Sequence, residues 1–184
     1  MNTTPILERL AALIHQSVRE DAAKHGLQPI HVQILGYLVR ANRYSDMPIA
    51  VAEYFGITRG TVSQSLKVLE EKALIRRLPD PRHGRRVHLQ LTDAGRSILK
   101  DGWSSRVEAA LAEHGLDSER LSASLLELLT ALQRHNNQRP FGVCHGCAHF
   151  LTEPVGHRCG LTGEPLMDEQ TDRICREWTD GKAA

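Results

Sequence analysis

Four cysteines lie within the last 41 residues of this 184-residue chain, and the sequence contains no others. Cys144, Cys147, Cys159 and Cys175 follow the pattern C-x2-C-x11-C-x15-C. Two thiolates that are two residues apart can bind one metal centre through a tight turn. A disulfide framework is not expected in a reducing compartment. The spacing therefore predicts a site with four thiolate ligands, and buried free thiols are the alternative.

Two kinds of metal centre suit these four ligands. Zinc binds four thiolates tetrahedrally and would stabilise a segment that is too short to fold around its own core. A [4Fe-4S] cluster also takes four cysteines and would make the segment sensitive to oxygen or redox state. His145, His149 and His157 could replace a cysteine, although we expect them outside the ligand shell. The choice between zinc and iron–sulfur stays open at this point.

A second chemistry is indicated by a helix with one apolar and one polar face. Thr58 is a suitable N-cap for a helix over residues 59–72. Apolar residues recur there at helical spacing and would face a core. The opposite face is small, polar and basic, which suits hydrogen bonding to base edges and phosphates in a DNA major groove. Its candidate contact residues are Arg59, Thr61, Ser63, Gln64 and Lys67.

A basic hairpin is predicted directly after this helix. Two alternating runs, residues 74–78 and 87–91, read as strands, and the segment between them is rich in Pro, Gly and Arg. Arg82, Arg85 and Arg86 would contact the DNA backbone or the minor groove from its tip. With a short helix over residues 50–55 and a turn at Gly56, the segment predicts a winged helix-turn-helix.

The string TRGTVSQSLKVLEEKALIRRLPDPRHGRRVHLQLTDAGR, Thr58 to Arg96, resembles the MarR family of bacterial transcription regulators. The resemblance extends from about Ile6 to Asn136 and leaves out Arg139 to Ala184. It implies a homodimer that places two recognition helices on a palindromic site in double-stranded DNA. It also implies a small-molecule effector between the dimer helices and the DNA-reading lobe, where His15, His31 and Trp103 are candidates.

The cysteine-rich tail carries a second, shorter resemblance. The segments FGVCHGCAHF, HRCGLTGEPL and ICREW are similar to the small cluster-binding subunits that accompany certain glycyl radical enzymes. This similarity slightly favours a [4Fe-4S] cluster over zinc. Redox or metal sensing by the DNA-binding protein would then depend on the tail, because the N-terminal region has no cysteine. A purely structural zinc site combined with an effector pocket is the alternative function.

The remaining elements are helical, so the predicted fold class is mainly α with a small β-wing. Apolar periodicity predicts helices over residues 5–24 and 29–41, one continuous helix from Thr92 towards Glu113, and a last long helix after Leu116. A short helix over residues 168–178 would carry Cys175. We divide the chain into a regulator domain, residues 1–138, and a cysteine module, residues 139–184. The module should lie beside the dimer helices, because it follows the last of them.

Charge distribution supports DNA as the partner. The net charge is only +1, but residues 58–100 hold ten Lys or Arg against four Asp or Glu. The tail from Pro140 holds four basic and seven acidic residues. No apolar run is long enough to span a bilayer, and the N-terminus does not read as a signal peptide. We therefore expect a cytoplasmic protein. Since no catalytic motif is present, we do not expect an enzyme.

Overall fold

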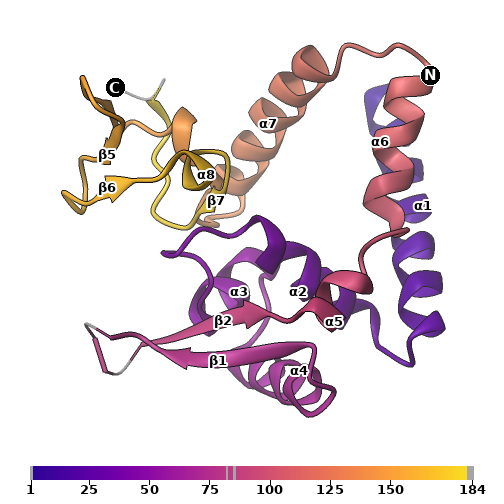
Figure 1. Cartoon of the computed structure of the whole chain (residues 1–184). Coiled ribbons are helices and arrows are strands. Elements are labelled where there is room, and N and C mark those ends of the chain that lie inside the picture. The colour runs from indigo at the N-terminus through magenta and orange to yellow at the C-terminus, as the bar shows by residue number, and fades with distance from the viewer. Residues whose placement is uncertain (1, 82, 85, 182–184) are drawn as a thin grey trace.

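A computed structural model describes residues 2–81, 83–84 and 86–181 of the chain. The fold is mainly helical with one small antiparallel wing, as the sequence predicts (Figure 1). Three parts can be distinguished: a winged-helix lobe, three helices outside it, and a cysteine module at the C-terminal end. In the described part of the chain, no helix has the length and apolar character that crossing a membrane would require.

The winged-helix lobe is built around the second to fourth helices. The first four helices are α1 Thr3–Lys24, α2 Pro29–Arg40, α3 Pro48–Phe55 and α4 Arg59–Glu71. Pro29 and Pro48 begin α2 and α3, where the missing proline N–H costs no hydrogen bond. Gly56 ends α3 at φ 62°, a left-handed conformation that glycine adopts without strain. Apolar side chains from α2, α3 and α4 pack with the wing into one core.

The wing is a two-stranded antiparallel hairpin. Strand β1 spans Ile75–Pro79 and β2 spans Val87–Leu91, with Ile75 opposite Leu91 and Pro79 opposite Val87. Ile75 and Leu89 are buried, and they anchor the hairpin to the lobe core. Arg82 and Arg85, two predicted DNA contacts, lie outside the described residues.

The predicted continuous helix from Thr92 to Glu113 is wrong. The chain forms a short α5, Asp93–Ser97, and a separate α6, Trp103–Glu113. The Asp21 carboxylate of α1 accepts a hydrogen bond from the Trp103 backbone N–H at 2.8 Å and pairs with Arg106 at 3.1 Å. A residue from another helix thus caps α6, and the helix begins there rather than continuing from α5.

The helices outside the lobe bury little of their apolar surface. Helix α6 is described in full and buries none of its residues, and α7, Ser118–His135, buries only Thr130. Helix α6 runs beside α1, whereas α7 stands apart from both (Figure 1). The exposed large apolar residues on α1, α6 and α7 include Ile6, Leu10, Leu13, Val107, Leu121, Leu125, Leu129 and Leu132. Leucine stripes usually face an intrachain core, but here they face away from it.

The cysteine module is a set of short elements. They are β3 Gly142–Val143, the single-turn η1 Cys144–Gly146, β4 Phe150–Thr152, β5 His157–Cys159, β6 Pro165–Leu166, α8 Asp168–Thr171 and β7 Ile174–Cys175. The predicted helix that carries Cys175 is wrong, because α8 ends at Thr171 and Cys175 lies in β7, opposite Gly142. Trp178 packs on Gly142 so closely that a Cβ there would lie 2.4 Å from its ring.

The module contacts the winged-helix lobe more than it contacts α1, α6 or α7, the helices expected to form the dimer. It reaches α7 through Arg134 and Asp180, 2.8 Å apart. It also contacts the loop over residues 41–47, α3, and α2, where the Arg173 guanidinium donates to the Val39 carbonyl. Ala41 forms a parallel bridge with Ile174, and Phe141 meets the ring of Tyr54 edge-on. The expected place beside the dimer helices is therefore only partly right.

Candidate nucleic-acid interface and cysteine site

The outer face of α4 presents all five predicted contact residues. Thr58 caps the helix, since its hydroxyl oxygen accepts a hydrogen bond from the Thr61 N–H at 3.1 Å. Val62, Leu66 and Leu69 are buried on the inner face. The exposed residues Arg59, Thr61, Ser63, Gln64 and Lys67 lie on the outside. This separation of faces leaves a polar and basic surface exposed to solvent.

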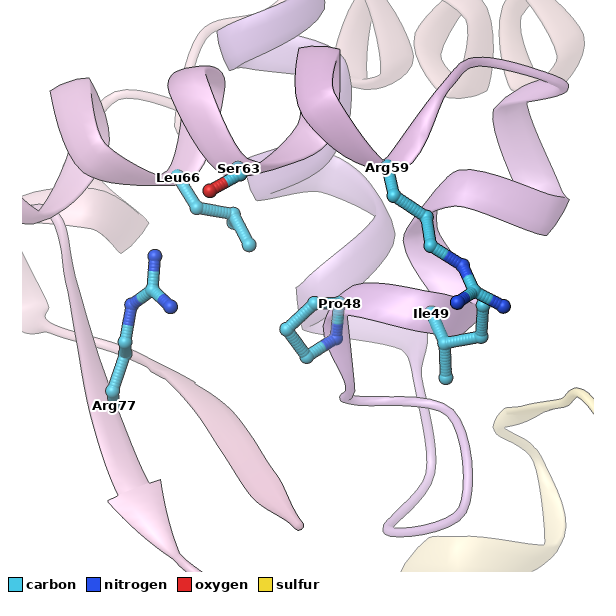
Figure 2. A pocket seen from close by; sticks show the side chains of 6 residues that line it. All are labelled: Pro48, Ile49, Arg59, Ser63, Leu66 and Arg77. Atoms are coloured by element: carbon cyan, nitrogen blue, oxygen red, sulfur yellow. The ribbon is translucent and has the colours of Figure 1, made fainter. Parts of the chain in front are cut away.

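A hollow of about 280 Å³ lies at the edge of this surface (Figure 2). It is lined by Pro48, Ile49, Arg59, Ser63, Leu66 and Arg77. Arg59 comes from the start of α4 and Arg77 from strand β1, so two guanidinium groups border one depression. Glu70 accepts a hydrogen bond from Arg77 Nε at 3.1 Å and restrains that side chain. The sequence reasoning missed Arg77; the pair Arg76-Arg77 in a strand was the available signal.

Of the three wing arginines predicted to contact DNA, Arg86 is the one that the structure describes, and it is exposed. Its N–H donates to the His83 carbonyl at 2.7 Å, and its own carbonyl accepts from the Asp80 N–H at 3.0 Å. The Asp80 carboxylate accepts a hydrogen bond from the His83 N–H at 3.0 Å. Asp80 therefore holds the backbone of the turn, and Arg86 is left at the surface of the wing.

A histidine joins the base of the wing to the loop before α3. His88 Nδ1 is 2.6 Å from an Asp46 oxygen, and its Nε2 is 3.2 Å from an Asp80 oxygen. Burial alone would lower the pKa of His88, but its contacts with the two carboxylates outweigh this effect and raise the pKa. The Leu89 N–H also donates to the Asp46 carbonyl at 2.7 Å. The loop before α3 thus sets the position of the wing.

The four cysteines of the module line one small cavity, together with His149 and apolar side chains that include Phe150. All four are free, and Cys144 and Cys175 are buried. These two thiols share a hydrogen bond, which raises the pKa of Cys144 and lowers that of Cys175. Within the described residues, no group of three or more His, Cys, Asp or Glu side chains is arranged so that it could hold a metal ion.

The donors around the sulfurs suit anionic thiolates. The Thr179 N–H donates to Cys147 Sγ at 3.4 Å. The Cys175 thiol is contacted by the side-chain amide of Asn42 and the backbone N–H of Glu177, and both favour its anionic form. Asn42 Nδ2 and Trp178 Nε1 are buried N–H donors with no hydrogen-bond partner among the described groups. The unsatisfied amide of Asn42, which favours the anionic form of Cys175, fits a centre that holds this thiol as a thiolate.

A larger cavity of about 640 Å³ lies between α1, α2, α3 and the α5–α6 region. Trp103, one of the three candidates for an effector pocket, lines it together with Tyr54, Phe55, Arg40 and Arg96. His31 does not line this cavity: it is buried at the start of α2, where its Nδ1 accepts from the Gln28 N–H at 3.2 Å. His15 is exposed on α1.

The fold and the arrangement of α3, α4 and the wing define a winged helix-turn-helix protein. Residues 25–86 match the model of the MarR family. Solved structures of MepR from Staphylococcus aureus share the fold. The structure of MepR in its DNA-binding conformation is 23% identical, with a TM-score of 0.61, and the match covers 72% of this chain and 100% of that one.

Two further MepR structures agree with this assignment of fold. The MepR–DNA complex is 23% identical with a TM-score of 0.55, and the match covers 72% of this chain and 97% of that chain. MepR described as a transcription regulator of the multidrug efflux pump MepA is 24% identical, with a TM-score of 0.52 and coverage of 72% and 100%. A comparison with curated proteins finds no match.

Proposed function

We propose that this chain is a DNA-binding transcription regulator of the MarR type. The observation that carries the proposal is the exposed polar and basic face of α4 beside an arginine-bearing wing. Such a face suits a major groove, and a wing suits the adjacent backbone or minor groove. MepR, whose fold this chain shares, is described in complex with DNA. Gln64 and Ser63 would read base edges, whereas Arg59, Lys67 and Arg86 would contact phosphates.

We further propose that the chain acts as a homodimer on a palindromic operator. The side chain of Leu129 on α7 is 48% exposed and that of Leu10 on α1 is 47% exposed. Exposed apolar stripes of this kind, on helices that bury little else, are typical of an interface. A twofold dimer through these helices would place two α4 helices in successive major grooves, about 34 Å apart.

Selection of duplexes from a random library by the purified full chain tests both statements. We expect enrichment of an inverted repeat whose half-sites lie about ten base pairs apart, bound by two chains per duplex. Affinity should fall steeply with salt, because each phosphate contact releases counterions. A chain that binds no duplex at low salt, or binds as one copy without sequence preference, would overturn the proposal.

The cysteine module supports a regulator that responds to metal or redox state. Cys144, Cys147, Cys159 and Cys175 line one cavity and would hold a [4Fe-4S] cluster or a zinc ion once their side chains rotate toward a common centre. An iron–sulfur cluster would supply redox or oxygen sensitivity. Anaerobic purification followed by a visible spectrum and metal analysis tests this idea. Iron with sulfide that bleaches in air supports sensing, one zinc per chain supports a structural site, and absence of both rejects the metal site.

A small-molecule effector is the second candidate signal, and the cavity around Trp103 favours it. Tyr54, Phe55 and Trp103 supply aromatic walls, while Arg40 and Arg96 supply positive charge. An aromatic carboxylate fits this chemistry. Titration of the full chain with benzoate and salicylate, followed by Trp fluorescence, tests the pocket. Saturable quenching that is lost in Trp103→Phe and Arg96→Ala supports it, and no response in the parent rejects it for these ligands.

A further inference from the structure

Asn42 lies in the loop between α2 and α3, and only one of the two polar groups of its side-chain amide, the oxygen, has hydrogen-bond partners. Its side chain is almost completely buried, since the residue is 1% exposed. Its Oδ1 accepts hydrogen bonds from the Tyr44 N–H at 3.0 Å and from the Ser45 hydroxyl at 2.8 Å. These two bonds fix the orientation of the amide. The Nδ2 group has no acceptor among the described residues, which is costly for a buried donor.

The unsatisfied end of Asn42 meets Cys175 of the cysteine module. The side-chain amide of Asn42 is one of the groups that lower the pKa of the Cys175 thiol, after the hydrogen bond from Cys144. The residues on both sides of Cys175 are bonded to the same loop: the Asn42 N–H donates to the Ile174 carbonyl at 3.0 Å, and the Arg176 N–H donates to Ser45 Oγ at 2.7 Å. These two bonds hold the loop that carries Asn42 beside Cys175. A neutral thiol is a weak acceptor, whereas a metal-bound thiolate is a strong one.

We propose that Asn42 donates an N–H···S hydrogen bond to the Cys175 thiolate when the four cysteines hold a metal, and thereby couples metal binding to the DNA-reading lobe of the same chain. The inference rests on the proposed four-thiolate site and adds a residue from outside the module. Outer hydrogen bonds of this kind orient a ligand and stabilise its charge, so Asn42 is a positioning residue for Cys175.

The loop that Asn42 organises continues directly to the wing. The Tyr37 hydroxyl donates to the Ser45 carbonyl at 2.8 Å, and the Leu89 N–H of β2 donates to the Asp46 carbonyl at 2.7 Å. Asp46 also holds His88. With metal bound, every polar group of Asn42 has a partner and the loop is fixed. Loss of the metal leaves Nδ2 without a partner, loosens residues 42–46 and weakens the hold on the wing. Metal binding therefore increases affinity for DNA.

Anaerobic titration of the metal-free full chain with Co²⁺ tests the inference, because thiolate ligation gives an intense charge-transfer absorption. Asn42→Asp keeps the Oδ1 acceptor and replaces the N–H donor with an oxygen. We expect its Co²⁺ affinity to be about 10- to 100-fold lower than that of the parent. Gln170→Glu is the matched control: Gln170 accepts a hydrogen bond from the Arg43 N–H at the same interface, so it undergoes the same amide-to-carboxylate change away from the sulfurs.

The outcomes separate this inference from the proposed site. If the parent shows no thiolate–Co²⁺ absorption, the four-thiolate site is rejected, and the inference falls with it. If the parent binds Co²⁺ and Asn42→Asp binds it equally tightly, the site stands and the role of Asn42 is rejected. An equal loss in Gln170→Glu would also reject it, because the effect would then be one of charge at the interface.

Hydrogen exchange of the unmutated chain gives a test that does not depend on the folding of a variant. We expect Zn²⁺ to slow amide exchange in residues 42–46 and in strand β2, beyond the module itself. Slower exchange confined to residues 142–179 would overturn the coupling. DNA affinity provides the functional readout: metal should strengthen binding by the parent and by Gln170→Glu, and this gain should vanish in Asn42→Asp.

Discussion

The guanidinium group of Arg176, the residue directly after Cys175, forms two hydrogen bonds with the Glu53 carboxylate of α3. The Nε–Oε2 distance is 2.5 Å and the Nη2–Oε1 distance is 2.9 Å. The pair lowers the pKa of Glu53 and raises that of Arg176. It attaches the strand that bears a candidate metal ligand to the helix that precedes the recognition helix.

Removing this ion pair should loosen the module from the lobe. Both side chains are less than one-third exposed, and paired charge-assisted hydrogen bonds of this kind contribute about 2 kcal/mol. We expect a double-mutant cycle of Arg176→Ala and Glu53→Ala, measured by urea unfolding of the full chain, to give a coupling energy of that order. The Arg158–Glu153 pair is the control. It has similar geometry but lies at the surface of the module, so its cycle should show no coupling above error.

Arg77 should contribute to DNA binding without selecting the sequence. It borders the hollow beside Arg59 and Ser63, where a phosphate could approach (Figure 2). We expect Arg77→Ala to weaken binding to cognate and random duplexes alike. The slope of the logarithm of the binding constant against the logarithm of salt concentration should become shallower by about one. Its neighbour Arg76 points to the other face of the strand, so Arg76→Ala is the control. Equal losses in both variants would indicate a general effect of charge instead of a contact at the hollow.

Gln64 should, unlike Arg77, determine which DNA sequence is bound. It is exposed on α4 and carries an amide that can pair with the edge of an adenine. We expect Gln64→Ala to cost about 1–3 kcal/mol on the cognate site and to change the preferred base at one position of each half-site, with little effect on random DNA. Competition binding against duplexes that differ at single positions measures this. A uniform loss on all duplexes would assign Gln64 to the backbone.

Local signals account for the part of the fold that the sequence predicts well. Thr58 caps α4, Gly56 ends α3, and the alternation after Leu74 marks the wing, all within a few residues of the elements they specify. The break between α5 and α6 has a distant cause, because Asp21 caps Trp103 from another helix. Periodicity in the segment itself continues across the break and cannot report it.

The residues of the candidate sites also fall into those that local sequence predicts and those that only the tertiary structure reveals. Helical spacing places Ser63 and Gln64 on the outer face of α4, so the sequence suffices for them. Cys175 lies in a strand because it pairs with Gly142, and this pairing is set by the fold of the whole module. Asn42 is a lone polar residue in a loop, and no pattern around it indicates that it meets a cysteine far along the chain. Such contacts arise from tertiary structure alone.

The contact between His88 and its two carboxylates should make stability depend on pH. The pKa of His88 is raised above its value of about 6.5 in an unfolded chain. The stabilisation is therefore fully present below about pH 6.5 and is lost as the pH rises through the pKa of the folded state. Burial raises the pKa of Asp46, and the hydrogen bond with His88 only partly offsets this rise. A carboxylate with a raised pKa in the folded state also makes stability fall as the pH rises. We expect the difference in unfolding free energy between the parent and His88→Gln to shrink as the pH rises above about 6.5 and through the raised pKa of His88.

A histidine NMR titration supplies the independent check on this pH dependence. His88 should titrate above about 6.5 in the parent, and Asp46→Asn should lower its pKa, because one of the two carboxylates is removed. Asp80 remains in that variant and is 3.2 Å from Nε2. A stability difference that is constant over the whole pH range would show that the contact acts by packing and not by charge.

The apolar face of α7 should be the part of the chain that controls dimerisation. Leu125 and Leu129 are 45% and 48% exposed and lie one turn apart on a helix that buries only Thr130. We expect Leu125→Glu combined with Leu129→Glu to give a folded monomer, because a buried dimer interface would have to accept two unpaired charges. Sedimentation velocity measures the mass, and circular dichroism checks the helices. Ala123→Glu, on the opposite face of α7, is the control and should stay dimeric. Since one half-site buries only half of the contact surface, the monomer should also lose affinity for the palindromic duplex. A leucine variant that remains dimeric would exclude this face as the interface and would require α1 and α6 to form it without α7.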